Sequence, residues 1–291
     1  MKNKERIAKL ALLSIAVIWG TSFVVLKNTL DSVTAFWVLS IRFIVSALIF
    51  LLFAGKKLFS ASKRCITGGV LLGVMLAVAY AFQTYGLVFT TPGKNAFLTA
   101  TYCVLTPFLA WLLFRRHPGA SSFTAAIICI VGIGFVSLNE GFHDINVGDM
   151  LTLVCGIFYA MQIVIMEQYR DSGDVTVLTA VEFATAAVLL TIAALIFEPL
   201  PHAVPKEAWM SIAYLAVMCT AVGFFLQAWA IQYTSSATAA MLMTLESVFG
   251  ALISVLFYGE QVTGKLFIGF VLIFSAVLVS ELKPLDTRKK N

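Results

Sequence analysis

Three ionisable side chains lie inside long apolar stretches of the sequence, namely Arg42, Glu182 and Glu246. A charged side chain near the centre of a bilayer costs roughly 2.5–3.5 kcal/mol on insertion scales, so each needs a partner or a water-filled cavity. A carboxylate placed there can bind a substrate ammonium or take up a proton. An arginine can carry charge in such a cavity, or it can only bond backbone carbonyls and hold helices together.

Amide and aromatic side chains in the same stretches could line a cavity. An amide hydrogen-bonds a zwitterion, and an aromatic face suits an ammonium group or an aromatic side chain. The candidates for substrate binding are Trp19, Tyr80, Gln83, Tyr102, Tyr159, Gln162, Gln227, Trp229 and Glu246. For the tryptophans and tyrosines the alternative is ordinary packing or anchoring at the membrane surface, whereas an amide in lipid needs a partner.

Other chemistries find little support in the sequence. His117, His143 and His202 are far apart in predicted loops and form no HExxH motif, and a Walker A motif is absent. The five cysteines never have CxxC spacing and lie in or beside apolar runs, which favours buried, reduced thiols over a disulfide framework or a zinc site. Ser22 could serve as a nucleophile, but no histidine lies within a predicted span to act as its base. We therefore expect no metal, no cofactor and no enzymatic activity.

Composition identifies the elements that must position these residues. Of the 291 residues, 60% are hydrophobic and 12% are charged, against roughly 45–50% and about 25% in soluble domains. Since a membrane-spanning helix needs roughly 20 apolar residues, the chain has room for about ten spans and short loops. The first apolar run, 7–27, follows a basic start as in a signal peptide, but its length and the absence of a cleavage pattern indicate a retained helix.

The hydropathy pattern predicts an all-α membrane protein. Inside hydrocarbon every backbone polar group must be paired within its segment, and the alternating pattern of a membrane barrel is missing. The predicted helices are 7–27, 33–54, 66–87, 95–114, 121–138, 149–168, 175–197, 209–232, 238–258 and 265–282.

Basic residues predict the orientation, because Lys and Arg are retained on the cytoplasmic side. With a cytoplasmic N-terminus, the inner loops and tails hold Lys2, Lys4, Arg6, Lys9, Lys56, Lys57, Lys63, Arg64, Arg115, Arg116, Arg170, Lys283, Arg288, Lys289 and Lys290. The outer loops hold only Lys27, Lys94, Lys206 and Lys265. We expect a multi-pass protein of the cytoplasmic membrane with both termini inside, and the net charge of +5 belongs to these flanks rather than to a nucleic-acid site.

The two halves of the sequence resemble each other when residue i is aligned with i+140. The matches are Trp19-Gly20 with Tyr159-Ala160, Arg42-Phe43 with Glu182-Phe183, and Leu105-Thr106-Pro107 with Leu245-Glu246-Ser247. Between the third and fourth helices the offset is 144, which aligns Gln83 with Gln227 and Thr90 with Thr234, so the first half carries four extra residues before Pro107. Glu246 then stands opposite Thr106.

A repeat of five helices has an odd number of spans, so its second copy enters the membrane from the opposite side. We expect one repeat in residues 1–140 and the other in 141–291, arranged around a central cavity. Inverted repeats are common in transporters because the two copies can exchange conformations around a central site. Gly20, Gly86, Gly250 and Gly269 are predicted close-packing points between helices.

These motifs resemble the ten-helix permeases of the drug/metabolite transporter superfamily, which have two EamA-type domains. The resemblance covers essentially the whole chain and is carried by Trp19-Gly20-Thr21-Ser22-Phe23, Arg42-Phe43, Gln83-Thr84-Tyr85-Gly86-Leu87, Thr90-Thr91, Thr106-Pro107, Leu245-Glu246, Gly259-Glu260 and Gly269. It implies inverted five-helix halves around a central cavity and export of amino acids or related metabolites.

The chain departs from the family pattern at three places. Arg115-Arg116-His117 stands where a Gly-Glu is common, Ser247 replaces a frequent proline, and Glu182 replaces an uncharged polar residue. Glu260, which follows the ninth predicted helix, is expected to be a solvated loop residue or a cap.

We therefore predict a secondary transporter, most simply an exporter of small polar metabolites such as amino acids, that works by alternating access in the lipid bilayer. Protons are a candidate coupling ion, and a nucleic-acid partner is not expected. The alternatives are a membrane receptor or structural protein that transports nothing, and an intramembrane hydrolase. The residues do not identify the substrate, the direction or coupling ion of transport, or the oligomeric state.

The first prediction concerns topology. A reporter fused after Lys283 should lie in the cytoplasm and one inserted near Gly141 should lie outside, because the Lys and Arg asymmetry survives only with an even number of spans. Activity of the two fusions in whole cells measures this. An external C-terminus or a cytoplasmic Gly141 loop would contradict it.

Overall fold

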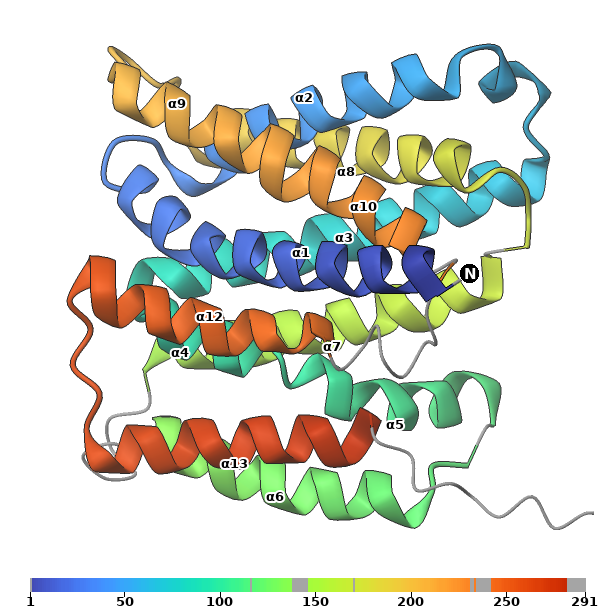
Figure 1. The fold of residues 1–291 in the computed structure, drawn as a ribbon. Helices are drawn as coiled ribbons and strands as arrows, with labels where there is room; N and C mark the ends of the chain where they lie inside the picture. Colours follow the sequence, from blue (N-terminus) through green and yellow to red (C-terminus); the bar gives the residue numbers. More distant parts are fainter. Residues whose placement is uncertain are drawn as a thin grey trace, which may run out of the picture.

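The computed structural model describes residues 2–115, 117–137, 146–169, 171–230, 233 and 242–281, and within these residues every regular element is a helix (Figure 1). Outside them lie Arg116, Gly141, His143, Arg170, Thr234 and the residues after 281. The elements are α1 Lys2–Thr29, α2 Ala35–Ala54, η1 Gly55–Ser60, α3 Lys63–Phe89, α4 Pro92–Thr99, α5 Tyr102–Phe114, α6 Ala120–Ser137, α7 Val147–Tyr169, α8 Val175–Phe197, α9 Lys206–Tyr214, η2 Leu215–Val222, α10 Gly223–Ala230, α12 Leu245–Ile253, η3 Ser254–Tyr258 and α13 Gly264–Glu281.

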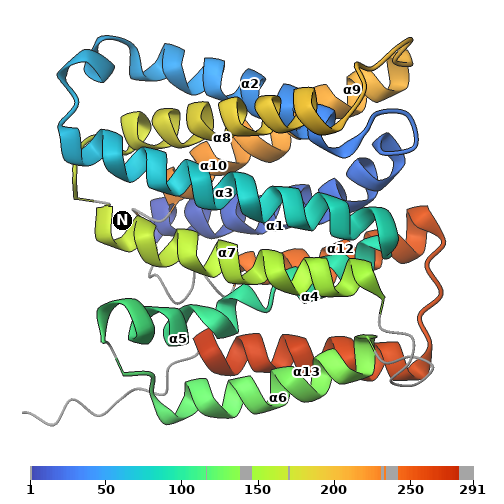
Figure 2. The same ribbon diagram turned by 180° about the vertical axis from the view of Figure 1, so that it is seen from behind.

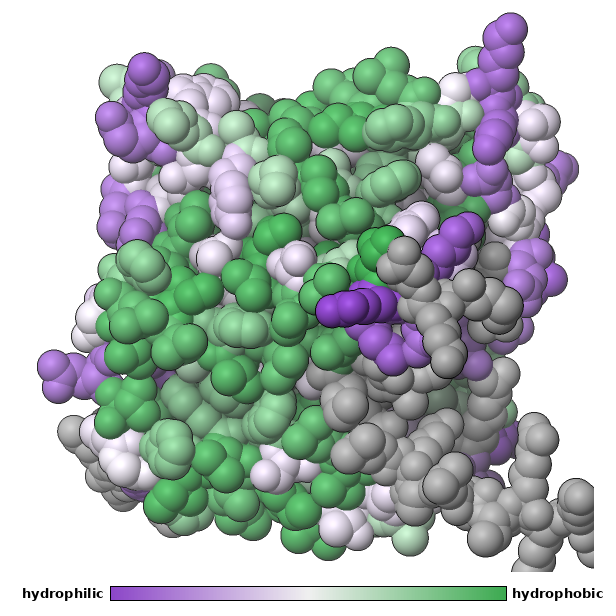
Figure 3. Space-filling view, in the orientation of Figure 1, coloured by the Kyte–Doolittle hydropathy of each residue, from purple (hydrophilic) through white to green (hydrophobic). Residues whose placement is uncertain are grey.

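The helices form a bundle suited to a bilayer. Eight helical segments are long and apolar enough to cross a membrane, and two shorter apolar helices, Leu245–Tyr258 and Gly264–Ser280, follow them. Exposed large apolar side chains such as Leu52, Ile127 and Leu195 cover the flanks of the bundle. Figure 3 shows the apolar band on one face, with hydrophilic residues gathered towards its two edges. The prediction of an all-α membrane protein with about ten spans is confirmed.

The bundle has two ends, which we call the near end, where α1 begins, and the far end, where α1 and α3 stop and α4 and α7 begin (Figures 1 and 2). By the helix directions, the near end carries Lys4, Arg6, Lys9, Lys56, Lys57, Lys63, Arg64 and Arg115, and the far end carries Lys27, Lys94, Lys206 and Lys265. Most basic residues of the described chain therefore lie together at the near end of the bundle, and only four lie at the far end.

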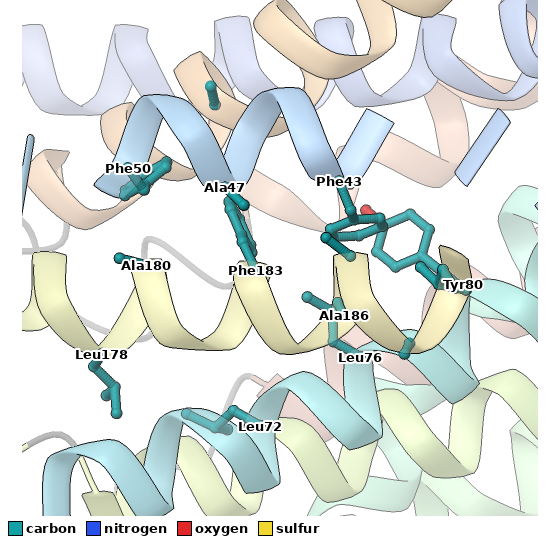
Figure 4. Close-up of a cluster of buried hydrophobic side chains, with 14 of the residues drawn as sticks. Phe43, Ala47, Phe50, Leu72, Leu76, Tyr80, Leu178, Ala180, Phe183 and Ala186 are labelled. Carbon is teal, nitrogen blue, oxygen red and sulfur yellow. The ribbon is translucent and has the colours of Figure 1, made fainter. Parts of the chain in front are cut away.

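The contacts between helices obey the two-fold axis of an inverted repeat, because each contact between the two halves recurs between the equivalent helices. The α3–α7 contact is matched by α10–α1, whereas α2 and α6 each pack against their own counterparts, α8 and α13. Phe43 and Phe183, which are equivalent at an offset of 140, meet edge to face with ring centroids 5.8 Å apart. Figure 4 shows these two rings in the cluster between α2 and α8. The axis of the inverted repeat passes close to this pair.

The predicted close-packing glycines are confirmed. A Cβ atom added to Gly20 would lie 2.7 Å from the Cβ of Phe249, and one added to Gly250 would lie 2.7 Å from the Cβ of Ala96. Gly269 approaches Val136 equally closely. Helices in a membrane associate largely through van der Waals contact, so small residues at the crossings let their backbones approach.

Three predicted helices are interrupted. The span predicted at 238–258 is broken at Thr244 and continues as α12 and the π-helix η3. The span predicted at 95–114 is divided into α4 and α5 at Ala100 and Thr101, and the Thr101 hydroxyl donates to the Leu98 carbonyl at 2.6 Å. The span predicted at 209–232 consists of α9, the π-helix η2 and α10. Irregular backbone is tolerated at membrane depth only where protein or a water-filled cavity surrounds it, so these breaks point to the centre of the bundle.

The structure also corrects the alignment of the repeats. The offset of 144 continues beyond the fourth helix, since α6 and α13 are both 18 residues long and begin at Ala120 and Gly264. Arg115 and Gly259, which end α5 and η3 in the left-handed region, are also 144 residues apart. Glu246 therefore stands opposite Tyr102 and not Thr106.

The second prediction tests the packing of α3 against α7. A Cβ atom at Gly86 would lie 2.5 Å from Thr152 Oγ1 and 2.9 Å from the Gly148 carbonyl oxygen. Gly86→Ala should therefore lower the stability of the purified protein by about 1–3 kcal/mol, as overpacking does. Thermal unfolding in detergent measures this, with Gly264→Ala as the control because nothing lies within 4 Å of its added Cβ. Equal melting temperatures for the two variants would contradict the prediction.

Candidate functional site

A cavity of about 130 Å³ lies at the centre of the bundle. Of the residues predicted from the sequence, it is lined by Trp19, Arg42, Tyr80, Gln83, Tyr102, Tyr159, Gln162, Gln227 and Glu246. Pockets for drug-sized ligands measure about 300–1,000 Å³, so this cavity suits a smaller molecule.

Most of the lining residues are pairs of equivalent residues from the two repeats. The pairs are Trp19/Tyr159, Ser22/Gln162 and Phe23/Ile163 at an offset of 140, and Tyr80/Phe224, Gln83/Gln227, Thr99/Met243 and Tyr102/Glu246 at an offset of 144. Leu26, Leu76 and Arg42 complete the lining without their counterparts. The cavity therefore lies on the axis that relates the repeats, and its two walls are built from the same positions with different chemistry.

The broken helices place two of these pairs. Thr99 ends α4 and Tyr102 begins α5, so the interruption at residues 100–101 lies beside the cavity. In the other repeat, Met243 and Glu246 lie on either side of Thr244, at the start of α12. Broken helices of this kind commonly build the substrate sites of transporters.

Arg42 is 3% exposed and bonds neutral groups. Its Nε donates to Thr220 Oγ1 at 2.7 Å, one terminal nitrogen donates to the Tyr80 hydroxyl at 3.3 Å, and the guanidinium carbon lies 4.8 Å from the centre of the Tyr80 ring. Among the described residues, no carboxylate oxygen lies within 4 Å of Arg42. Arg42 and Glu182 thus form no ion pair, and the positive charge of Arg42 is left to act on the cavity.

The π-helix η2 supplies acceptors for this centre. The Thr220 hydroxyl donates to the Leu215 carbonyl at 2.9 Å, which leaves its oxygen to accept from Arg42. Trp19 Nε1 donates to the Cys219 carbonyl at 2.7 Å, and the Ser46 hydroxyl donates to the Ala216 carbonyl at 2.9 Å. Widened turns of this kind are frequent at functional sites. Here the turn presents oxygen atoms sideways to α1 and α2.

A chain of hydrogen bonds holds the amide of Gln83. The Tyr159 hydroxyl donates to Gln83 Oε1 at 3.0 Å, and Gln83 Nε2 donates to Thr99 Oγ1 at 3.1 Å. The equivalent Gln227 donates from Nε2 to the Met243 sulfur at 3.5 Å, a weaker partner. The two amides thus differ in how firmly they are held, and Gln227 can exchange its partner at lower cost.

Two predicted site residues lie outside the cavity lining. Glu182 is fully buried behind it, where Oε1 accepts from Gln162 Nε2 at 2.7 Å and Oε2 has no hydrogen-bond partner among the described residues. It reaches the cavity only through Gln162. Trp229 packs against Tyr233 with ring centroids 5.2 Å apart, in the cluster around Leu12 and Ile15.

The sequence prediction missed several lining residues. They are Ser22, Phe23, Leu26, Leu76, Thr99, Ile163, Phe224 and Met243. The signal was helical spacing, since 19, 22, 23 and 26 lie on one face of a helix, as do 76, 80 and 83. Apolar members of such a face are indistinguishable from packing residues in sequence.

Of the two roles expected for Glu260, a solvated loop residue or a cap, a polar cluster at the far end supports the cap. This side chain is 8% exposed and not solvated. Its carboxylate accepts from the Thr91 hydroxyl, the Ser254 hydroxyl and, at 2.9 Å, the Gly93 backbone N–H. Glu260 therefore caps the N-terminus of α4, where a negative charge is favoured.

The connection between α3 and α4 is held from two further helices. Asp149 of α7 is fully buried and accepts from the Thr90 hydroxyl at 2.5 Å and from Lys94 Nζ at 3.4 Å. Lys27 of α1 donates to the carbonyls of Leu87, Val88 and Thr90, at 2.6, 2.9 and 3.0 Å. Residues 87–94 are thus fastened to α1, α7 and the segment after η3.

Other expectations about reactive groups are settled by burial. The five cysteines are buried, as predicted. His117 and His202 lie in loops, as predicted.

An inverted repeat of membrane helices around a cavity on its axis is the architecture of many transporters. The model of the EamA-like transporter family matches residues 6–138 and again residues 146–282. The chain belongs to this family.

Known relatives agree with this assignment. An uncharacterized transporter of Archaeoglobus fulgidus is 31% identical over 280 residues, covering 96% of this chain and 87% of the relative. A protein of Escherichia coli K12 named "Probable amino-acid metabolite efflux pump" is 25% identical, covering 96% and 95% of the two chains. A solved crystal structure aligns with a TM-score of 0.68 over 94% of this chain and 96% of that chain, at 15% identity. The last similarity shows the fold alone.

The third prediction concerns Glu260. Glu260→Ala leaves the Gly93 N–H and two hydroxyls without their acceptor, and a buried unsatisfied donor costs about 1–3 kcal/mol. The variant should therefore melt at a lower temperature in detergent and be cleaved faster by protease at residues 87–94. Glu207→Ala, at an exposed carboxylate of α9, is the control. Melting and cleavage equal to the control would show that the cap contributes nothing.

Proposed function

We propose that this protein is a secondary transporter that exports small polar metabolites such as amino acids by alternating access. The observation that carries the proposal is the central cavity, which lies on the axis of the repeat and contains a cation and a carboxylate from different helices. Exchange of conformations between the two halves, residues 1–140 and 141–291, would open this cavity alternately to the near and far ends.

A zwitterion matches the lining chemically. Arg42 would attract the carboxylate of a substrate and Glu246 its ammonium, while Gln83 and Gln227 offer amides to its polar groups. The tyrosine rings beside Arg42 suit an ammonium or an aromatic side chain. The name of the Escherichia coli relative supports amino-acid metabolites as the substrate class. Glu246 is also the group that would take up a proton if transport is coupled to protons.

The near end would face the cytoplasm. It carries most of the described basic residues, which are retained on that side of the cytoplasmic membrane. This orientation places the Glu260 cluster and residues 87–94 at the outer surface. Binding from the near end and release at the far end would constitute export.

The rival functions have weaker support. In an intramembrane hydrolase Ser22 would need a base, but its hydroxyl donates to the Trp19 carbonyl at 2.6 Å, and none of the described residues that line the cavity is a histidine. A receptor would bind without moving its ligand. Metabolite profiling of medium from overproducing cells, followed by flux of each accumulating compound into proteoliposomes, distinguishes transport from both.

The fourth prediction separates the roles of Glu246 and Arg42. Glu246→Gln keeps the shape of the side chain but removes its charge, so it should abolish transport or its pH dependence while the protein still folds. Arg42→Ala should mainly lower the yield of folded protein, because it leaves Thr220 and Tyr80 without their donor.

Flux across about pH 6 to 8 and size-exclusion profiles measure the two effects. Exposed residues provide matched controls, Glu207→Gln for the carboxylate and Arg64→Ala for the cation. Transport by Glu246→Gln at the wild-type rate over this range would reduce Glu246 to a packing residue and leave the site to the cavity amides.

A further inference from the structure

A second cavity, of about 300 Å³, lies between α5, α6 and α7. It is lined by Thr101, Val104, Leu105, Phe108, Ala126, Cys129, Ile130, Ile133, Leu153, Val154 and Ile157. Thr101 carries the lone hydroxyl of this lining and already donates it to the Leu98 carbonyl at 2.6 Å. Cavities that stay empty of water in proteins are apolar, and apolar side chains such as these do not orient a polar solute.

This cavity is continuous with the membrane-facing surface. Ile130 and Ile157 in its lining are 68% and 41% exposed. On α6 they are accompanied by Phe123 and Ile127, which are also exposed. In contrast, Val104 and Cys129 on the inner wall are 3% and 4% exposed. The cavity is therefore a recess that begins in the bilayer and ends inside the protein.

The recess is a property of one repeat. At an offset of 144, Ala126 corresponds to Phe270, Cys129 to Ile273, Leu105 to Phe249 and Ile130 to Phe274, and in each pair the second repeat has the larger side chain. The reverse holds at Phe108 and Ile133, whose counterparts are Leu252 and Val277.

The larger side chains of the second repeat are used in packing. Phe270 stacks on Phe97 with centroids 4.2 Å apart, Ile273 packs against Gly132, and Phe249 packs against Gly20. The smaller residues of the first repeat leave the equivalent volume to be filled by something else.

We propose that one acyl chain of a bilayer lipid occupies this recess. Hydrocarbon is the medium at its mouth, and a chain that enters gains the van der Waals contacts that an empty recess forfeits. The polar headgroup stays at the membrane surface, so no buried polar partner is needed. The acyl chain lies behind the wall of the central cavity, since α5 and α7 also carry Tyr102 and Tyr159, which line that cavity. Any approach of α5 to α7 must expel it.

The test is photolabelling of the full-length protein in phosphatidylethanolamine–phosphatidylglycerol vesicles. A small fraction of the lipid carries a diazirine on one acyl chain, and labelled residues are mapped by mass spectrometry. We expect the wild-type protein to be labelled at the buried Val104 and Cys129. The label should fall several-fold in Ala126→Phe, which introduces the phenylalanine found at the equivalent position 270 of the second repeat. Ile127→Phe, a matched substitution at a 66% exposed position of α6, should leave it unchanged.

A second variant guards against misfolding of the first. Cys129→Ile adds less volume than Ala126→Phe and introduces the isoleucine found at the equivalent position 273. It should lower the label at Val104. Absence of label at Val104 and Cys129 in the wild type would overturn the proposal. So would undiminished label at Val104 in both filling variants, or an equal loss in Ile127→Phe. The measurement needs no transport, so its outcome is independent of the function proposed above.

Discussion

Burial of the Arg42 guanidinium is the interaction on which the centre of the bundle depends. A cation in hydrocarbon requires acceptors, and regular helices offer few, because their carbonyls are already bonded along the helix. The π-helix η2 solves this problem by presenting Thr220 to Arg42 and the Cys219 carbonyl to Trp19. The same irregular turn therefore fixes a side chain from α2 and another from α1, and both line the central cavity.

Equivalent positions of the two repeats supply the geometry of the cavity, and the differences between them supply its chemistry. Tyr102 and Glu246 occupy the same place beside a broken helix, yet only Glu246 can carry charge at neutral pH. Arg42 and Glu182 are also equivalent, but Arg42 reaches the cavity and Glu182 is withdrawn behind Gln162. The symmetric fold thus encloses an asymmetric site, which a zwitterion with distinct ends requires.

The spans, their number and most of the polar lining could be predicted because each depends on local composition or helical spacing. The helix breaks could not, since hydropathy averaged over some 20 residues conceals Ala100 and Thr101. The predicted alignment of the two repeats was also wrong from Leu105 onward. Thr106 and Tyr102 lie four residues apart on one helical face, so aligning Glu246 with either of them keeps the same face inward. For Glu260 the sequence left a solvated loop residue and a cap as alternatives, because its burial depends on α4, far away in the sequence.

At each end of the bundle a helix ends in a residue with left-handed backbone angles, and the residue that follows is acidic at the far end and basic at the near end. Gly259 and Arg115 both end a helix in the left-handed region, with φ of 74° and 55°. After Gly259 comes Glu260, whose carboxylate caps α4; after Arg115 the sequence continues with a second arginine, which cannot cap a helix N-terminus. If the repeats exchange conformations, the far end has a closing contact that the near end cannot form by the same means. The two states of such a transporter then differ in energy before any substrate binds, and the Glu260 contacts contribute to that difference.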